Sequence, residues 1–518
     1  MNIGLATTRS ARRYPDRLAA FDCHRQMRWA ELDERSNRLA NLLHSGLGLE
    51  KGSRVAFWAP NRLAVPEVLA GVAKAGMVYV GLNFRMSDTD FSHVFQNAEP
   101  RLLIVAGEFR ERAEHLVAGQ DIRIIDLDDR SPEAYEALIS RASAASPETL
   151  HCIRPEDDFC IVYTSGTTGT PKGVWFDHGR ALQHATVAAL EYQIDLDTRY
   201  LTAIPHNSSV HITLAPCMLM GGATGFFDTR SFDAESYLRE VARTQATHSY
   251  LVPTQLYRLL ETTAGHDAFA SMQTMGYGAA PMAPDKIGRL LDRFGPIFIQ
   301  LYGMAEIASI GTMLRKVDHV SAVNGHPELL RSVGQPSYAI DVRVVDQAGR
   351  DVPQGKHGEV IFSAPYMMKG YYRDPERTSR TLIDGWIHSG DVAEVDDNGF
   401  IYIVDRIKDL IIRGGYNIAP VEIEAALHQH PDILEVGVIG LPDEQWGESI
   451  LAVIALKPGA SADEASMLNW CRQQAALSSV KRPERVEFLA SLPKNAVGKI
   501  AKNELRRNFA PKRSGPEH

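Results

Sequence analysis

The sequence predicts an α/β protein built in parts: a large region of layered α/β sheets, a smaller β-rich region and a C-terminal α+β region. Its 518 residues exceed the roughly 250–300 at which one hydrophobic core stops growing. Helix and strand patterns alternate through the first third of the chain, and hairpin patterns replace them further on. The composition, 44% hydrophobic and 23% charged, is that of an ordinary globular protein.

The first third contains repeated helix–strand units. Apolar residues at Leu32, Leu39 and Leu43 predict a helix, and a short buried strand follows at 54–59. The same pattern returns in 64–83 and 91–107, and the apolar stretch 159–163 predicts another strand. This alternation favours a parallel sheet with helices packed against it.

The later part of the chain changes character. Segments 339–352, 358–364 and 392–406 read as strands joined at Gly, Asn and Asp, which predicts hairpins. A helix then begins with Pro420 in its first turn, followed by strands at 435–440, 451–456 and 485–489 and a helix at 463–475. These last roughly 110 residues are enough for a separate C-terminal domain.

Charge and cysteine usage narrow the function classes. A net charge of -9 gives no overall attraction to nucleic acid. The five cysteines have no CxxC spacing, so neither a zinc site nor a disulfide framework is expected, and a reducing compartment fits. The chain has no run of 18 apolar residues and no signal-peptide pattern. We therefore expect a cytoplasmic protein without a membrane span.

The stretch "YTSGTTGTPKGVW", 163–175, follows a predicted strand and combines hydroxyl side chains, glycines and one lysine. Such a loop can direct N–H and O–H groups at a phosphate while the lysine supplies charge. The Walker pattern fails because Pro171 and Gly173 flank Lys172, and the dinucleotide pattern GxGxxG is absent too. A polar surface loop is the alternative interpretation.

The string "TSGTTGTPKG" resembles the phosphate loop of the adenylate-forming superfamily, which includes acyl-CoA synthetases, peptide-synthetase adenylation domains and firefly-type luciferases. Further motifs of that superfamily follow in the same order: "GYGAAP" at 276–281, "YGMAE" at 302–306, "GWIHSGD" at 385–391, "VDRIKDLIIRGGYNIAPVEIE" at 404–424 and "PKNAVGK" at 493–499. The resemblance thus spans nearly the whole chain. It implies an N-terminal domain at 1–404, with a β-barrel-like subdomain at about 335–404, and a mobile C-terminal domain at 405–518.

The reaction that this resemblance implies joins a carboxylate to the α-phosphate of ATP and then passes the acyl group to a thiol. ATP, Mg²⁺ and coenzyme A are the cofactors it implies. The phosphates would be held by Thr164, Ser165, Gly166, Thr167, Thr168, Gly169 and Lys172. Glu306 and Thr168 would be the metal ligands, although a lone glutamate is more often a solvated surface group.

The other nucleotide contacts are also implied by the resemblance. The adenine would lie between Tyr302 and the small residues Gly278, Ala279 and Ala280. Asp391 would bind the ribose hydroxyls and Arg406 would add a cation beside them. Lys499 would stabilise the charge that develops during adenylation, whereas a lysine near a chain end is otherwise solvated.

The resemblance also implies a rotation of the C-terminal domain about a hinge at Asp405 between the two half-reactions. This rotation would withdraw Lys499 and bring a loop containing Gly414, Gly415 and Tyr416 to the coenzyme A channel. One departure from the family pattern is Ala305, which stands where the family has a threonine. The missing hydrogen bond would cost roughly 1.5–3 kcal/mol unless water or Ser309 replaces it.

The acid pocket is less constrained. Its candidate residues are mainly apolar with an imidazole: His206, Val210, His211, Phe226, Tyr277, Gly278 and Ile307. Which of the two histidines lines the pocket stays open, and either one can be structural. Asn207 stands where amino-acid-adenylating domains carry an aspartate, which disfavours an amino-acid substrate. An aliphatic or aromatic monocarboxylate fits this set best.

The sequence therefore predicts an ATP-dependent carboxylic acid:CoA ligase. An adenylating enzyme that loads a carrier-protein thiol is the first alternative, although the chain ends soon after Lys499 without a fused carrier domain. A nucleotide-binding protein that has lost catalysis is the second, motivated by Ala305. The expected partners are the acid, ATP and coenzyme A, with no nucleic acid, and a homodimer stays open as the assembly.

Overall fold

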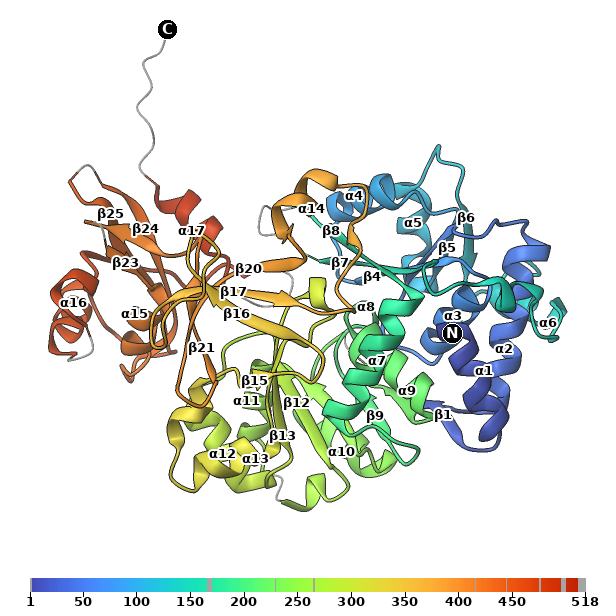
Figure 1. Ribbon diagram of the computed structural model, residues 1–518, viewed down its shortest axis with the longest axis horizontal. Coiled ribbons are helices and arrows are strands. Elements are labelled where there is room, and N and C mark those ends of the chain that lie inside the picture. The colour runs from blue at the N-terminus through green and yellow to red at the C-terminus, as the bar shows by residue number, and fades with distance from the viewer. Residues whose placement is uncertain are drawn as a thin grey trace, which may run out of the picture. The chain divides into compact units, whose positions relative to one another are not determined.

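The protein is described by a computed structural model that covers residues 2–164, 170–228, 230–263, 266–414, 416–443, 445–474, 477–494 and 500–510. The chain divides into two compact units, which are described separately (Figure 1). The first comprises Met1–Val342 and Phe362–His388, and the second comprises Arg343–Ile361 and Ser389–His518. The expected boundary at Asp405 stays a prediction.

A seven-stranded sheet in the first unit carries the phosphate loop. Its order is β18-β8-β7-β4-β3-β5-β6. Strands β3–β7 are parallel to one another, and β8 is antiparallel to its two neighbours, β7 and β18. The strands are β3 Arg54–Trp58, β4 Val78–Leu82, β5 Leu102–Val105, β6 Arg123–Asp126, β7 Asp158–Thr164, β8 Lys172–Asp177 and β18 Gly370–Tyr371. Helices α2 Trp29–Asn41, α3 Ala64–Lys74 and α4 Asp88–Ala98 lie between the predicted strands. The predicted helix–strand alternation is confirmed.

Helices α4 and α5, Arg110–Leu116, lie beside this sheet (Figure 1). Apolar side chains hold them there. Trp58 of β3 packs against Phe91 of α4 with ring centroids 4.8 Å apart, and Phe91 stacks on Phe95 at 4.0 Å. Burying a large apolar side chain contributes about 1.5–3 kcal/mol. This cluster therefore fixes the helices to the strands whose ends carry the loop.

A second, nine-stranded sheet in the same unit has the order β15-β14-β13-β12-β11-β9-β10-β1-β2. Its strands are β1 Leu18–Phe21, β2 Gln26–Arg28, β9 Arg199–Thr202, β10 Ala223–Phe226, β11 His248–Leu251, β12 Thr274–Gly278, β13 Phe298–Tyr302, β14 Thr312–Leu314 and β15 Gln335–Pro336. Strands β11, β12 and β13 are parallel. Their carboxyl ends therefore share one edge, where Gly278 and Tyr302 lie.

Other helices cover these sheets in the first unit. They are α1 Ile3–Arg13, α6 Tyr135–Arg141, α7 His178–Tyr192, α8 His206–Ser209, α9 Ala215–Met220, α10 Ala234–Thr244, α11 Pro253–Glu261, α12 Pro284–Phe294, α13 Lys316–Val323 and α14 Pro375–Thr381. Among the helices described, none has the length and apolar character needed to cross a membrane.

The predicted hairpin region forms a five-stranded sheet with the order β16-β17-β20-β19, and β21 pairs with β20. Its strands are β16 Asp341–Val345, β17 Gly358–Ser363, β19 Leu382–Ile383, β20 Trp386–Val395 and β21 Ile401–Arg406. β20 and β21 are antiparallel, with Asp391 opposite Arg406. This register places two of the predicted site residues side by side.

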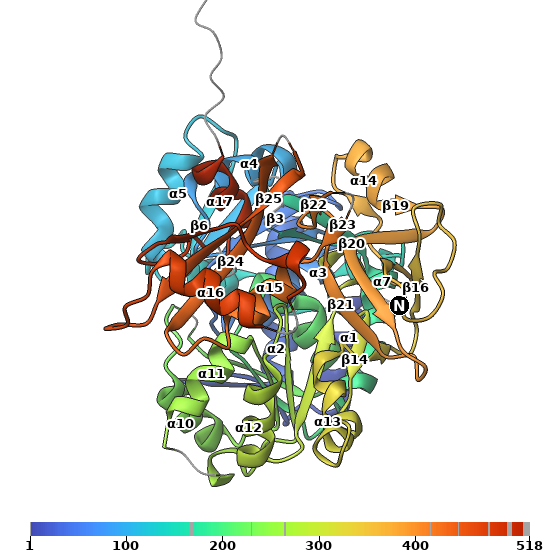
Figure 2. The same ribbon diagram turned by 90° about the vertical axis from the view of Figure 1, so that its left-hand side faces the viewer.

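The C-terminal part of the second unit is the predicted α+β domain (Figure 2). Its sheet has the order β23-β22-β25-β24, with β26 on β25. The elements are β22 Ile411–Arg413, β23 Tyr416–Ile418, α15 Pro420–Leu427, β24 Ile433–Asp443, β25 Gly447–Leu456, α16 Glu464–Gln473, β26 Arg485–Phe488 and α17 Lys502–Phe509. One apolar cluster packs α15 and α16 on one face, and another packs α17 on the opposite face. Pro420 begins α15 as predicted.

Six buried histidines make the first unit sensitive to acid: His178, His184, His206, His211, His248 and His319. Burial lowers the pKa of His178 to about 3, lowers the pKa of His206, His211, His248 and His319 to about 4, and lowers that of His184 well below its usual value. A folded-state pKa below the unfolded value means that the unfolded chain binds protons first as the pH falls. Stability is therefore lost between about pH 6.5 and pH 4, and these groups have no effect above that range.

We expect each buried histidine to lower the free energy of unfolding by about 1.4 kcal/mol per pH unit in that range. Urea denaturation at pH 7.5, 6.0 and 5.0 measures this slope. The variant His206→Gln should reduce this slope by about 1.4 kcal/mol per pH unit, the contribution of one histidine. Equal slopes in the wild type and His206→Gln would show that His206 does not contribute.

Candidate active site

The phosphate loop joins two antiparallel strands of the seven-stranded sheet. Thr164 at the end of β7 lies opposite Lys172 at the start of β8. Residues Ser165, Gly166, Thr167, Thr168 and Gly169 lie outside the described residues. The Thr164 Oγ1 atom is buried and has no hydrogen-bond partner within the described chain. A buried, unpaired hydroxyl at the mouth of this loop is a donor suited to a phosphate oxygen.

Lys172 and Glu306 form an ion pair, and Tyr371 joins both. The Lys172 Nζ atom donates to Glu306 Oε1, and it also donates to the Tyr371 hydroxyl at 2.8 Å. The Tyr371 hydroxyl donates to the same Glu306 oxygen. Burial and the neighbouring carboxylate raise the pKa of Tyr371 well above its usual value, so its proton stays in place. One carboxylate oxygen therefore receives two donors.

Glu306 is held by a tight turn that follows β13. A short 3-10 helix, Ala305–Ile307, carries it, and Ala308 and Ser309 reverse the chain with φ angles of 53° and 83°. The glutamate is only 2% exposed. A buried carboxylate is costly unless it is paired, so Lys172 and Tyr371 stabilise its charge. Ala305 at the preceding position has no side-chain donor.

Tyr371 was not predicted as a site residue. Its strand β18 pairs with β8, so that Tyr371 lies opposite Val174, two residues after Lys172. The backbone N–H of Met368 donates to the Glu306 carbonyl at 2.8 Å. The segment from Met368 to Tyr371 therefore connects the phosphate-loop strand to the glutamate, a link between residues some 200 positions apart in the chain.

The candidate adenine residues lie where β12 and β13 end. Gly278 lies opposite Leu301 and has a φ angle of 157°, and a Cβ atom there would approach the Leu301 carbonyl oxygen to 2.2 Å. Only glycine fits at this position. The next residue, Ala279, has a φ angle of 64°, and Ala280 follows it. Tyr302 ends β13, with its ring 6.0 Å from that of Phe362.

Asp391 and Arg406, the candidate ribose residues, belong to the second unit. Arg406 Nε donates to Asp391 Oδ1 at 2.8 Å across the β20–β21 pair. Asp391 is 8% exposed, while the Arg406 side chain is 46% exposed. The arginine orients a carboxylate that can accept hydrogen bonds from ribose hydroxyls.

Asp405, the predicted hinge residue, connects β21 to α15. Its Oδ1 atom accepts a hydrogen bond from the Arg406 N–H at 2.7 Å, and its Oδ2 atom accepts one from the Val421 N–H at 3.2 Å. Val421 lies in the first turn of α15, where N–H groups lack partners within the helix. Burial raises the pKa of Asp405. The residue thus ties the strand to the start of the helix.

Two of the candidate coenzyme A residues, Gly414 and Tyr416, lie in the β22–β23 hairpin. Gly414 has a φ angle of 55° and donates its N–H to the Trp446 carbonyl at 2.8 Å. Tyr416 is 61% exposed. Gly415 and the catalytic candidate Lys499 lie outside the described residues.

The predicted acid-pocket residues lie in different surroundings. His206 Nε2 donates to the Ala59 carbonyl at 3.1 Å, so its Nδ1 accepts from the Tyr79 hydroxyl at 2.9 Å. Both ring nitrogens are therefore used inside the protein. The Tyr277 hydroxyl lies 2.9 Å from His319 Nε2 in α13. Four other candidates, Val210, Phe226, Gly278 and Ile307, are buried.

His211 keeps an unpaired nitrogen. Its Nε2 atom lies 3.7 Å from Cys160 Sγ, and its Nδ1 atom is buried without a hydrogen-bond partner among the residues described. Its ring packs 4.4 Å from Phe176 and 5.7 Å from His184, a second buried imidazole that was not predicted. Of the two histidines left open by the sequence, His211 is therefore the one with a free ring nitrogen.

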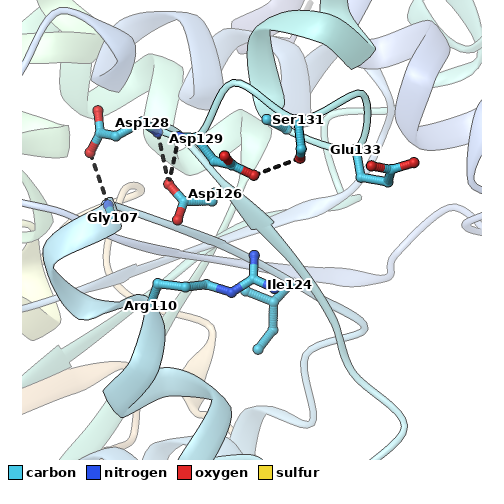
Figure 3. Close-up of a pocket in the computed structure, with 9 residues that line it drawn as sticks. Gly107, Arg110, Ile124, Asp126, Asp128, Asp129, Ser131 and Glu133 are labelled. Carbon is cyan, nitrogen blue, oxygen red and sulfur yellow. Dashed lines mark hydrogen bonds between the residues drawn. The ribbon is translucent and has the colours of Figure 1, made fainter.

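A hollow of about 620 Å³ at the ends of β5 and β6 does not contain any of the candidate residues (Figure 3). Its aspartates are engaged with the chain itself. Asp126 Oδ1 accepts from the N–H groups of Asp128 and Asp129 at 2.8 and 3.2 Å, and Asp128 accepts from the Gly107 N–H at 2.9 Å. These hydrogen bonds stabilise turns of the backbone. The hollow is therefore not the candidate active site, despite its volume.

Two parts of the chain match families of known proteins. Residues 7–372 match the family of AMP-binding enzymes, and residues 422–499 match the AMP-binding enzyme C-terminal domain. The chain belongs to the AMP-binding enzyme family. It is an adenylate-forming enzyme of the acyl-CoA synthetase type, with a large N-terminal and a small C-terminal domain.

Two relatives and one solved structure show how far this AMP-binding enzyme resembles others. It is 36% identical over 516 residues to a feruloyl-CoA synthase of Amycolatopsis sp, covering 98% of this chain and 99% of that protein. It is 34% identical to the medium/long-chain-fatty-acid–CoA ligase FadD8 of Mycobacterium tuberculosis, covering 89% and 82%. Its fold matches ATP-bound MatB from Rhodopseudomonas palustris with a TM-score of 0.87, 28% identity and coverage of 98% and 99%.

Proposed function

We propose that the protein ligates a monocarboxylic acid to coenzyme A through an acyl-adenylate, consuming ATP. The observation that carries the proposal is the Lys172–Glu306–Tyr371 cluster at the end of the phosphate-loop strand. In this cluster an ammonium suited to a phosphate contacts a buried carboxylate suited to a metal, which supports the proposal. The likeness along the full chain to acid–CoA ligases supports the same reaction.

The residues present fit a nucleotide with a divalent cation. The Thr164 hydroxyl, which has no partner among the residues described, and the Lys172 ammonium would be donors for phosphate oxygens. Glu306 offers the hard carboxylate oxygen that Mg²⁺ prefers, and Mg²⁺ commonly takes only one or two carboxylates beside substrate phosphates. When bound, the cation supplies charge neutralisation at the phosphates.

The other roles follow from the motifs. Residues 165–169 would add phosphate contacts, with Thr168 near the metal, and Tyr302 with 278–280 would hold the adenine. Asp391, oriented by Arg406, would bind the ribose. Lys499 would stabilise the charge between carboxylate and α-phosphate, and Asp405 would act as the hinge that lets the second half-reaction proceed.

The acid is proposed to be an aromatic or aliphatic monocarboxylate. Val210, Phe226 and Ile307 are buried apolar side chains and bring no cation for a second carboxylate. The two relatives are named for acids of these types: feruloyl-CoA synthase for an aromatic acid, and the FadD8 ligase for medium- and long-chain fatty acids. The two types share a carboxylate attached to an apolar body, which the candidate pocket can desolvate.

A panel of acids tests the proposal. The enzyme would be incubated with ATP, Mg²⁺ and coenzyme A together with ferulate, medium-chain and long-chain fatty acids, succinate and phenylalanine. We expect AMP release and thioester formation with at least one monocarboxylate, and none with succinate or phenylalanine.

A parallel arm of the panel replaces coenzyme A with a phosphopantetheinylated carrier protein. Thioester formation on the carrier protein alone would contradict the assignment of coenzyme A as acceptor. Absence of AMP release with every acid would contradict the ligase function itself. ATP binding in that case would identify a nucleotide-binding protein without catalysis.

A further inference from the structure

We propose that Tyr371 is a positioning residue that keeps Glu306 oriented for the metal when Lys172 turns to the phosphates of ATP. The inference rests on the proposed function, because it concerns how this site accepts ATP with Mg²⁺. Tyr371 would not touch the reacting atoms. It acts through the two charged groups that it joins.

The Tyr371 hydroxyl is a hydrogen-bond donor to one charged group and an acceptor from the other. Its hydroxyl donates to Glu306 Oε1 and accepts from Lys172 Nζ at 2.8 Å. The lysine also donates directly to that carboxylate oxygen. The Lys172 ammonium has three N–H donors, and Glu306 and Tyr371 accept from two of them. A bound phosphate would compete with Glu306 for the charge of the ammonium, whereas Tyr371 is neutral.

Moving the Lys172 ammonium away from Glu306 would cost electrostatic free energy. Glu306 is 2% exposed, so its carboxylate depends on partners within the protein when the lysine moves. A cation that replaces the ammonium restores the charge balance, but it needs the carboxylate in a fixed orientation. The Tyr371 hydroxyl supplies that orientation through its hydrogen bond to Glu306 Oε1, which does not depend on the position of the ammonium.

The backbone around Tyr371 fixes its position relative to both partners. Its own N–H donates to Thr378 Oγ1 in α14 at 2.9 Å, and β18 is paired to β8, which begins with Lys172. The Met368 N–H holds the Glu306 carbonyl. The phenol is thus attached through the backbone to the strand of the lysine and to the turn of the glutamate, as a positioning residue must be.

The variant Tyr371→Phe removes the hydroxyl and keeps the ring. Calorimetric titration would measure the Kd of a non-hydrolysable ATP analogue with an α,β-methylene bridge, in excess Mg²⁺ and in EDTA, and the Kd of AMP. We expect the Kd of the Mg²⁺-bound analogue to rise about tenfold. The Kd of AMP and the rate of thioester formation from supplied acyl-adenylate should change less than about twofold.

The matched control is Tyr372→Phe, which removes a hydroxyl one residue away where the ring packs on Trp175. It should bind the analogue as the wild type does. The double variant Lys172→Ala/Tyr371→Phe should lose less than the two single losses combined, because both changes act on the same cluster. Thermal unfolding of every variant checks the fold.

Unchanged binding of the Mg²⁺ analogue by Tyr371→Phe would overturn the inference. An equal loss of AMP binding would also overturn it, because a general structural role would then explain the effect. Strict additivity in the double variant would show that Tyr371 does not act through Lys172. None of these binding measurements requires an acid substrate, so a failed acid panel would count against the proposed function alone.

Discussion

Replacing Glu306 with Gln should lower acid-dependent ATP–pyrophosphate exchange by about 10²–10³-fold. The change keeps the size of the side chain and removes the charge that pairs with Lys172 and would bind Mg²⁺. Thioester formation from supplied acyl-adenylate should stay within a few-fold of wild type, because that half-reaction no longer uses the β- and γ-phosphates. Isotope exchange and a stopped thioester assay measure the two half-reactions separately.

The control Glu191→Gln removes another buried carboxylate of the same unit. Glu191 accepts from Arg315 at 2.8 Å and is not part of the Lys172 cluster. This variant should lose stability but keep the ratio of the two half-reactions. An equal fall of both half-reactions in Glu306→Gln would contradict the metal-binding role and indicate a loss of folded enzyme.

Replacing Lys499 with Ala should reduce adenylation by about 10²–10³-fold while sparing thioester formation from supplied acyl-adenylate. The lysine is assigned to the charge that develops when the carboxylate attacks the α-phosphate, which occurs only in the first half-reaction. The same exchange and thioester assays separate the two steps.

Lys494→Ala is the matched control for Lys499, because it lies in the same "PKNAVGK" motif and pairs with Glu435 within its own unit. A half-exposed ion pair contributes little to stability, so this variant should behave as the wild type. Equal loss of both half-reactions in Lys499→Ala, or an equal effect in Lys494→Ala, would contradict the role given to Lys499.

The sequence predicted the local elements well where periodicity and breakers agree. The helices and strands between 29 and 105 appear as expected, because each helix has an apolar stripe and each strand is a short buried run. Pro420 marked the first turn of α15 for the same kind of local reason. The order of strands in the sheets could not be predicted, because it depends on contacts between distant segments.

In the candidate site, too, some residues could be predicted from the sequence and others could not. Lys172 and Glu306 were expected to act on one nucleotide, and their side chains are in direct contact. Tyr371 escaped prediction because "KGYYRDPER" has no chemical signature of its own, and only the pairing of β18 with β8 brings it to the cluster. The sequence could not show that both ring nitrogens of His206 have partners, because Ala59 and Tyr79 lie far away in the chain.

The path of a single oxygen atom tests the account most directly. The acid that is active in the panel would be labelled with ¹⁸O in its carboxylate and turned over with ATP and coenzyme A. Attack of the carboxylate on the α-phosphate predicts one ¹⁸O atom in the released AMP and none in pyrophosphate. Unlabelled AMP, or ADP together with labelled phosphate, would contradict the acyl-adenylate route.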